Sequence, residues 1–381
     1  MPLSKTPYWR LSGFYFFYFA SLGVLVPYWG LYLQWLDFSA REIGELTAIL
    51  LATRIVAPNI WGWIADHQGH RMRIVRFASL ASVLSFAGIL IDQSYFWIAM
   101  VMLVFSFFWN ASLPQFEVTT LQYLGNNSHH YSKIRLWGSI GFIVIVAIVG
   151  QLLEFFEPSI IPYAVLISMI GIWLISLSVP ESGSRHLTIK HPPITTVLKR
   201  PEVIAFLTIC FFVQISHGPY YTFYSIYLEQ HHYSRSLIGQ LWALGVIAEV
   251  IIFLMMHKWL PRFGIRTVLL VSLFLSTVRW LLIGFFPDKL PILLLAQLFH
   301  AASFGTFHAA AIAWVHQHFT GNNQGRGQAL YSSVSFGAGG AIGSLFSGYL
   351  WLSPGPTITF SIAALASFVA WGIGMIWLKN N

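Results

Sequence analysis

The chain has 381 residues, of which 56% are hydrophobic and only 9% are charged, and its net charge is +8. Because soluble domains carry about 25% charged residues, this composition excludes a soluble enzyme, a disordered protein and a nucleic-acid-binding protein. It predicts a polytopic membrane protein. The single cysteine, Cys210, lies in an apolar run, which excludes an intramolecular disulfide.

Apolar runs long enough to cross a bilayer, about 20 residues each, recur along the whole chain. The first follows Lys5 and Arg10, as in a signal peptide, but it is too long for a cleaved segment and lacks a small-residue cleavage site. We therefore predict that it is a membrane span. The twelve predicted spans lie near residues 11–33, 43–65, 74–91, 95–121, 136–153, 160–179, 203–227, 237–256, 268–286, 291–315, 330–350 and 358–378.

The basic residues are distributed unequally between the two sides that these spans define. Arg41, Arg235 and Lys289 fall on one side and Arg54 and Arg279 fall inside spans, whereas every other lysine and arginine falls on the side of the N-terminus. Cytoplasmic loops carry an excess of basic residues. The pattern predicts a multi-pass protein of a bacterial-type inner (plasma) membrane, with both termini in the cytoplasm.

The two halves of the chain are similar in sequence. A shift of 195 residues aligns residues 16–71 with 211–266 without a gap and pairs Gly44 with Gly239. We predict an all-α membrane protein with two pseudo-symmetric six-helix bundles at 1–180 and 203–381, joined by a cytoplasmic linker at 181–202. In this architecture the solute binds between the halves, near the midplane of the bilayer.

The loop after the second span contains Gly62, Asp66, Gly69 and Arg71. This spacing resembles the signature of the major facilitator superfamily, so the resemblance implies the major facilitator fold. We expect Gly69 to permit a tight turn, and Asp66 to cap a helix N-terminus and to pair with a cation of the neighbouring bundle. These residues would then form a gate that holds the cytoplasmic side shut in one state.

A narrower resemblance comes from the segment 131–142, from Glu249 and from His300 and His308. Together they resemble the 3-phenylpropionate transporter family, which is related to the lactose permease and nucleoside symporter groups. The resemblance implies import of an aromatic monocarboxylate together with protons. Import of a sugar or a nucleoside is an alternative, and so is drug efflux by antiport, although the fifth span lacks the proline of that pattern.

We expect no enzymatic activity, no cofactor and no nucleic-acid partner. The partners predicted for this chain are a small-molecule substrate, protons and the lipid bilayer, and we expect a monomer. Histidine pairs occur in loops and at span ends, but no cluster of acidic ligands accompanies them, so we predict no metal site.

Ionisable residues inside spans are costly and indicate functional sites. Arg54 and Glu249 occupy equivalent positions in the two repeats, so we expect them at matching depths on opposite walls of a shared cavity, where they would pair in a closed state. Each could instead be satisfied within its own half.

Glu117 and His308 are a second pair of repeat equivalents, in the fourth and tenth spans. A pair between Glu117 and Arg135 would join the fourth and fifth spans. The resemblance to the lactose permease group implies a role for such a pair in substrate binding, whereas a bridge that only joins two helices is the alternative.

We predict Glu249 as the proton carrier, because an acid beside histidine and arginine in a wet crevice suits proton coupling. Arg279, in the adjacent span, is its second candidate partner, and His308 is the tuner or the alternative carrier. His300 and His308 lie eight residues apart on one ridge with Phe304 between them. A histidine in a helix is also often only a structural hydrogen-bonding residue.

The seventh span contains an aromatic run that begins after a Gly-Pro pair. Two residues of this span, His217 and Tyr221, are candidates for substrate binding. The other candidates are Glu117, Arg135, His300 and Arg54, and Arg54 would be the counter-charge to a carboxylate. Aromatic belts at the membrane interface explain many of these rings equally well.

Overall fold

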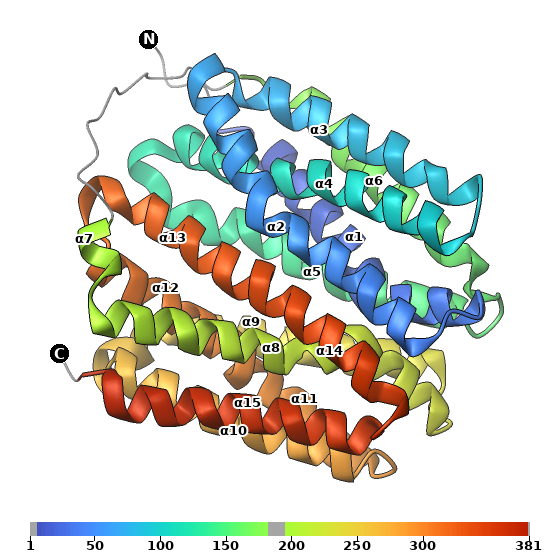
Figure 1. The fold of residues 1–381 in the computed structure, drawn as a ribbon. Helices are drawn as coiled ribbons and strands as arrows, with labels where there is room; N and C mark the ends of the chain where they lie inside the picture. The colour runs from blue at the N-terminus through green and yellow to red at the C-terminus, as the bar shows by residue number, and fades with distance from the viewer. Residues whose placement is uncertain (1–5, 182–194, 380–381) are drawn as a thin grey trace.

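The computed structural model describes residues 6–181 and 195–379, and within these ranges the chain folds into helices joined by short turns (Figure 1). Most of the predicted linker, 181–202, lies outside the described residues. The first half contains α1 (Tyr8–Trp35), α2 (Ala40–Gln68), α3 (Arg71–Phe86), α4 (Tyr95–Leu124), α5 (Tyr131–Leu152) and α6 (Ile161–Ser178). The second half contains the short α7 (Thr195–Leu198), then α8 (Pro201–Gln230), α9 (Arg235–Phe263), α10 (Ile265–Phe285) and α15 (Pro356–Trp377).

Two further helices of the second half each contain a π-helical segment. α11 (Leu290–His300) continues through η4 (Ala301–Thr306) into α12 (Phe307–His318), and α13 (Gln324–Ser332) continues through η6 (Ser333–Gly339) into α14 (Gly340–Leu352). Among the described residues, eleven helices are long and apolar enough to cross a membrane. The stretch from α13 to α14, which covers the predicted span 330–350, is less apolar and is not among these eleven. The prediction of an all-α membrane fold is therefore confirmed.

The ends of α2 follow from its local sequence. Ser39 and Glu42 form a capping box, because each side chain accepts a hydrogen bond from the other residue's backbone N–H. Gly69 ends the helix with φ +71°, in the left-handed region that glycine adopts without a steric penalty. The tight turn expected at Gly69 is present.

In Figure 1 the first half lies mostly in the upper part and the second half mostly in the lower part, with α2, α5, α13 and α14 in the middle of the view. They meet mainly where α2 packs on α14, where α5 packs on α9 and where α1 packs on α8. The exposed outer faces carry large hydrophobic side chains such as Phe96, Leu174 and Leu254, as a lipid-facing surface requires.

Glycines bring the halves into backbone contact at two of these crossings. A Cβ atom placed on Gly44 of α2 would lie 2.7 Å from the Cα of Gly348 on α14. One placed on Gly239 of α9 would lie 2.7 Å from the carbonyl oxygen of Val146 and 3.5 Å from the Cα of Gly150, both on α5. Because Gly44 and Gly239 are repeat equivalents, the two crossings are related by the same repeat.

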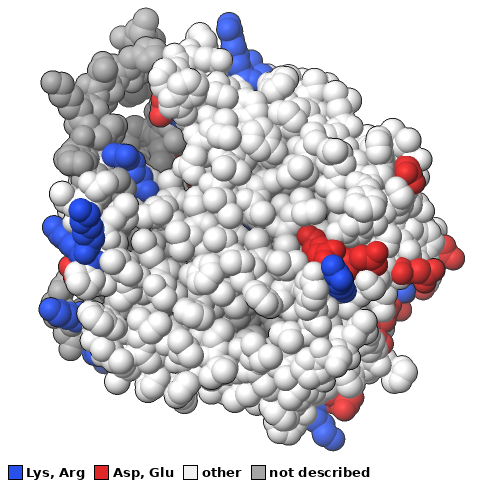
Figure 2. Space-filling model, viewed as in Figure 1, with Lys and Arg blue, Asp and Glu red and all other residues white. Residues whose placement is uncertain are grey.

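Both crossings lie at the same end of the molecule, which we call the acidic end. Its loops and adjoining helix turns carry Asp37, Glu42, Glu45, Asp92, Glu154, Glu157, Glu229 and Asp288. Figure 2 shows the acidic side chains gathered at this end, on the right, and most of the basic ones at the opposite, basic end. This separation matches the charge asymmetry on which we predicted the orientation, and the orientation itself stays a prediction.

Hydrogen bonds between the halves are shortest at the acidic end. The N–H of Ser236 on α9 donates to Glu154 at 2.6 Å. Nearer the basic end, the hydroxyl of Ser333 on η6 is 3.5 Å from Asn59 and from the carbonyl oxygen of Ile55, both on α2. The conformation described here is therefore closed at the acidic end.

Candidate functional site

Arg54 lies in the middle of α2, and its half-buried guanidinium turns toward α4. Its Nε donates to Asn110 Oδ1 at 3.1 Å, and its Cζ lies 5.8 Å from the centre of the Trp109 ring. The ring of Tyr18, on α1, stacks on the ring of Trp109, and the two ring centres are 4.8 Å apart. Within the described parts of the chain, no carboxylate lies within 4 Å of Arg54.

Glu249 of α9 faces the π segment of the second half. Its Oε2 lies 3.6 Å from Nε2 of His300, and its Cγ would be 2.8 Å from a Cβ on Gly305. The structure does not show the predicted pair of Arg54 and Glu249, because each side chain has turned toward its own half. Repeat equivalence carried no information on the direction in which each side chain points.

Glu117 and Arg135 are linked through tyrosines rather than directly. Glu117 Oε1 accepts a hydrogen bond from the Tyr131 hydroxyl at 3.1 Å, while the Arg135 guanidinium lies 3.7 Å from the centre of the Phe19 ring and 5.9 Å from that of Tyr15. In the described ranges, the direct pair that we predicted is not among the ion pairs within 4 Å. The guanidinium of Arg135 instead lies against the aromatic rings of α1.

Arg135 is also near charged groups of the other half, which the sequence did not suggest. It is within electrostatic reach of both Glu249 and His308, which belong to the second half. The packing of α5 on α9 brings these groups toward one another. Tyr221 of α8 is likewise within electrostatic reach of Arg54 and of Glu249.

The aromatic ridge predicted in the tenth span is present. The rings of His300 and Phe304 stack at 5.4 Å, those of Phe304 and His308 stack at 6.1 Å, and both pairs are nearly parallel. In a regular α-helix, side chains eight residues apart differ in direction by about 80°. The π segment η4, between the two histidines, has a wider turn that reduces this difference.

Arg279 has different partners from the one we predicted, Glu249. It is fully buried within the second half, where its Nε donates to the Ala296 carbonyl at 3.0 Å and its Nη1 donates to Ser303 at 3.1 Å. Its Cζ lies 4.1 Å from the centre of the Tyr220 ring. The ion pair of Arg279 with Glu249 is absent from the described residues, because α11 and η4 supply other partners for the guanidinium.

His217 is also buried in the second half. Its Nδ1 bonds to the Val213 carbonyl at 2.8 Å, and its ring lies edge-on against Trp280 and stacks at 5.5 Å on Tyr221. Tyr221 is only half-buried, so of this pair Tyr221 is the better placed to meet a solute. His308 is half-buried too, and its Nδ1 bonds to the Tyr331 hydroxyl at 2.9 Å.

The predicted gating loop lies at the basic end. Asp66, in the last turn of α2, pairs with Arg71, the first residue of α3, and Arg71 also donates to Gln115 of α4. Asp66 belongs to the last turn of α2, so it does not cap a helix N-terminus, and its partner is not in the neighbouring bundle. Gly62 lies one turn earlier, where a Cβ would meet Gln115 only at 3.7 Å.

Comparisons with known proteins agree with this architecture. A family model described as the MFS_1 like family matches residues 8–362. The chain is 28% identical over 372 residues to a probable 3-phenylpropionic acid transporter of Escherichia coli (strain K12), which covers 94% of both chains. It is 23% identical to the maltose permease of Geobacillus stearothermophilus, over 92% of this chain and 90% of the permease.

A solved structure extends the likeness to the fold. The crystal structure of a mutant of the nucleoside transporter NupG superposes with a TM-score of 0.87, over 98% of this chain and 100% of that chain, at 18% identity. At this identity the similarity establishes the arrangement of the helices and leaves the solute open.

Proposed function

Because the chain belongs to the MFS_1 like family and is a multi-pass membrane transporter, we propose that it imports an aromatic monocarboxylate, such as 3-phenylpropionate, together with protons. Transport would proceed by alternating access, in which the site between the halves opens to one side of the membrane at a time. The relative named as a probable 3-phenylpropionic acid transporter supports this choice of solute.

The observation that carries the proposal is the environment of Arg54. A half-buried guanidinium in a membrane span, without a carboxylate partner in the described structure, is a suitable counter-charge for the carboxylate of a solute. Trp109 and Tyr18 lie beside it and offer flat faces to an aromatic ring, and Tyr221 is within electrostatic reach of it. The two chemical parts of an aromatic acid thus match two adjacent parts of the site.

Proton coupling is assigned to Glu249. When its carboxyl is ionised it attracts Arg135 of the other half, and when it is protonated this attraction is lost. The strength of the contact between the halves therefore depends on the proton that Glu249 carries. His300, at 3.6 Å, and His308 are the neighbours that exchange or tune this proton.

We further propose that the protein works as a monomer in a bacterial-type inner membrane, with the basic end and both termini in the cytoplasm. The charge separation in Figure 2 supports this orientation. The division into bundles at 1–180 and 203–381 is supported by the helix packing, which is denser within each half than between the halves except at the crossings.

The test is uptake of labelled 3-phenylpropionate into proteoliposomes that carry a pH gradient. We expect accumulation that a protonophore abolishes. Arg54→Gln should raise KM by at least tenfold, whereas Lys133→Gln, which removes a cation from an exposed position, should leave KM unchanged. Glu249→Gln should abolish uphill accumulation and leave exchange of solute intact. Uptake that ignores the gradient, or normal accumulation by Glu249→Gln, would contradict the assignment.

A nucleoside or a sugar is the second candidate solute. It is favoured by the likeness to the NupG structure and to the maltose permease. An uncharged solute does not need the guanidinium charge of Arg54, so its uptake should survive Arg54→Gln. Competition of the labelled uptake by a nucleoside or by maltose separates the two candidates.

A further inference from the structure

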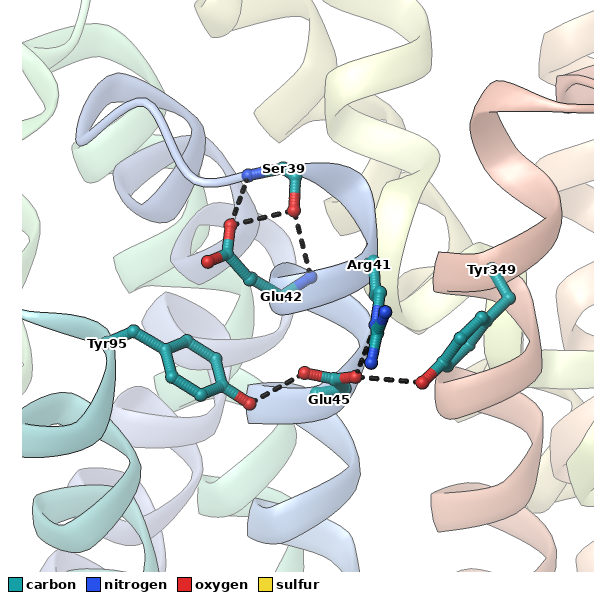
Figure 3. Close-up of polar contacts among 6 residues, drawn as sticks. All are labelled: Ser39, Arg41, Glu42, Glu45, Tyr95 and Tyr349. Carbon is teal, nitrogen blue, oxygen red and sulfur yellow. Dashed lines mark hydrogen bonds and ion pairs between the residues drawn. The ribbon is translucent and has the colours of Figure 1, made fainter.

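At the acidic end, a network of polar contacts joins α2, α4 and α14 (Figure 3). Its residues Glu45 and Tyr349 directly follow Gly44 and Gly348, which are in contact. The carboxylate of Glu45 on α2 accepts hydrogen bonds from the Tyr95 hydroxyl at 2.6 Å, from Arg41 Nε at 2.8 Å and from the Tyr349 hydroxyl at 2.9 Å. The three donors belong to α4, α2 and α14, respectively.

The donors differ in the half of the protein to which they belong. Tyr95 and Arg41 are in the same half as Glu45, whereas Tyr349 is in the other half. Arg41 adds a second contact across the interface, because its Cζ lies 4.9 Å from the centre of the Tyr349 ring. The neighbouring Glu42 is occupied with Ser39 in the capping box, so it takes no part in this network.

We propose that Glu45 and Tyr349 form a latch that holds the acidic end closed and that separates when this end opens during transport. The hydrogen bond between them forms only while α2 and α14 are in contact at Gly44 and Gly348. The latch is a gating element of the transport cycle, and it acts whichever solute the protein carries.

The geometry makes this latch easy to release. When α14 moves away, Glu45 keeps its bonds to Tyr95 and Arg41, so its carboxylate is not left without partners. The side chains are also close to water: that of Glu45 is 19% exposed and Tyr349 is 47% exposed, so water replaces the broken bond. Opening therefore costs one hydrogen bond and one cation–π contact, a modest bias toward the closed state.

The test measures how often the acidic end opens. Ala48 lies one turn deeper than Gly44 on the same face of α2, so Ala48→Cys reports access past the crossing, and the native Cys210 is fully buried. A membrane-impermeant maleimide is applied separately to intact cells and to inverted vesicles. Labelling of Asp37→Cys, an exposed loop residue, identifies the preparation in which the reagent reaches the acidic end.

In the Ala48→Cys background, we expect Tyr349→Phe to increase the rate of alkylation from the acidic end by about 3- to 10-fold, the effect of one hydrogen bond. Glu45→Gln should have a similar effect, and the double variant should add little to either. Tyr95→Phe is the matched control, since it removes a hydrogen bond to the same carboxylate from within the same half, and it should leave the rate unchanged. An unchanged rate in Tyr349→Phe, or an equal increase in Tyr95→Phe, would overturn the proposal.

Discussion

Adding a single methyl group to Gly44 should open the acidic end. The new Cβ would lie 2.7 Å from the Cα of Gly348 and 2.8 Å from the carbonyl oxygen of Ser344, whereas ordinary contacts begin near 3.4 Å. Both neighbours are backbone atoms, so the helices themselves must separate. Forcing extra atoms into a packed contact typically costs about 1–3 kcal/mol. This cost falls only on the closed state, so the ratio of open to closed should rise about 5- to 150-fold.

The alkylation of Ala48→Cys from the acidic end measures this ratio for Gly44→Ala. Gly372→Ala is the control, because Gly372 of α15 has no atom within 4 Å of its added Cβ, while the gain in helix propensity is the same. We expect a faster reaction in Gly44→Ala and an unchanged one in Gly372→Ala. Equal rates in the two variants would show that the glycine contact does not control opening.

Two further predictions concern stability. In the loop before α4, the Ser94 hydroxyl and N–H donate hydrogen bonds to Asp92 and hold the pKa of that carboxyl below its ordinary value. These bonds therefore stabilise the fold at neutral pH, and the stabilisation is lost as the pH falls through the lowered pKa. Thermal unfolding should therefore show Ser94→Ala to be less stable than the parent at pH 7, with a difference that shrinks below about pH 4. Arg279→Lys should lower stability by about 1–3 kcal/mol in the same measurement. One ammonium cannot replace both Nε, which donates to Ala296, and Nη1, which donates to Ser303. An unchanged unfolding midpoint would contradict this prediction.

Much of the architecture could be predicted from the sequence. Apolar length located the spans, and the repeat identified Gly44 and Gly239 as equivalent before both were seen at crossings. The turn at Gly69 was predictable because glycine adopts the left-handed backbone region at a helix end without the steric penalty that other residues incur.

The partners of the charged groups could not be predicted in the same way. Arg54 bonds to Asn110 and Glu249 lies near His300, each within its own half, and Arg279 is enclosed by backbone and aromatic groups. Position along a helix determines depth in the membrane, but the rotation of each helix depends on packing between segments that are distant in the chain. For the same reason, the reach of Arg135 toward Glu249 had no signal in the sequence.

The π segment at Ala301–Thr306 has a consequence for insertions and deletions in this gene. A π turn accommodates one residue more than an α turn of the same extent. Deleting one residue inside it should convert the turn to α and leave α12 facing as before, whereas a deletion in the regular part of the same helix rotates everything downstream by about 100°. This helix thus has a segment in which a frame-preserving loss of one codon leaves His300 and His308 on the same face of the span.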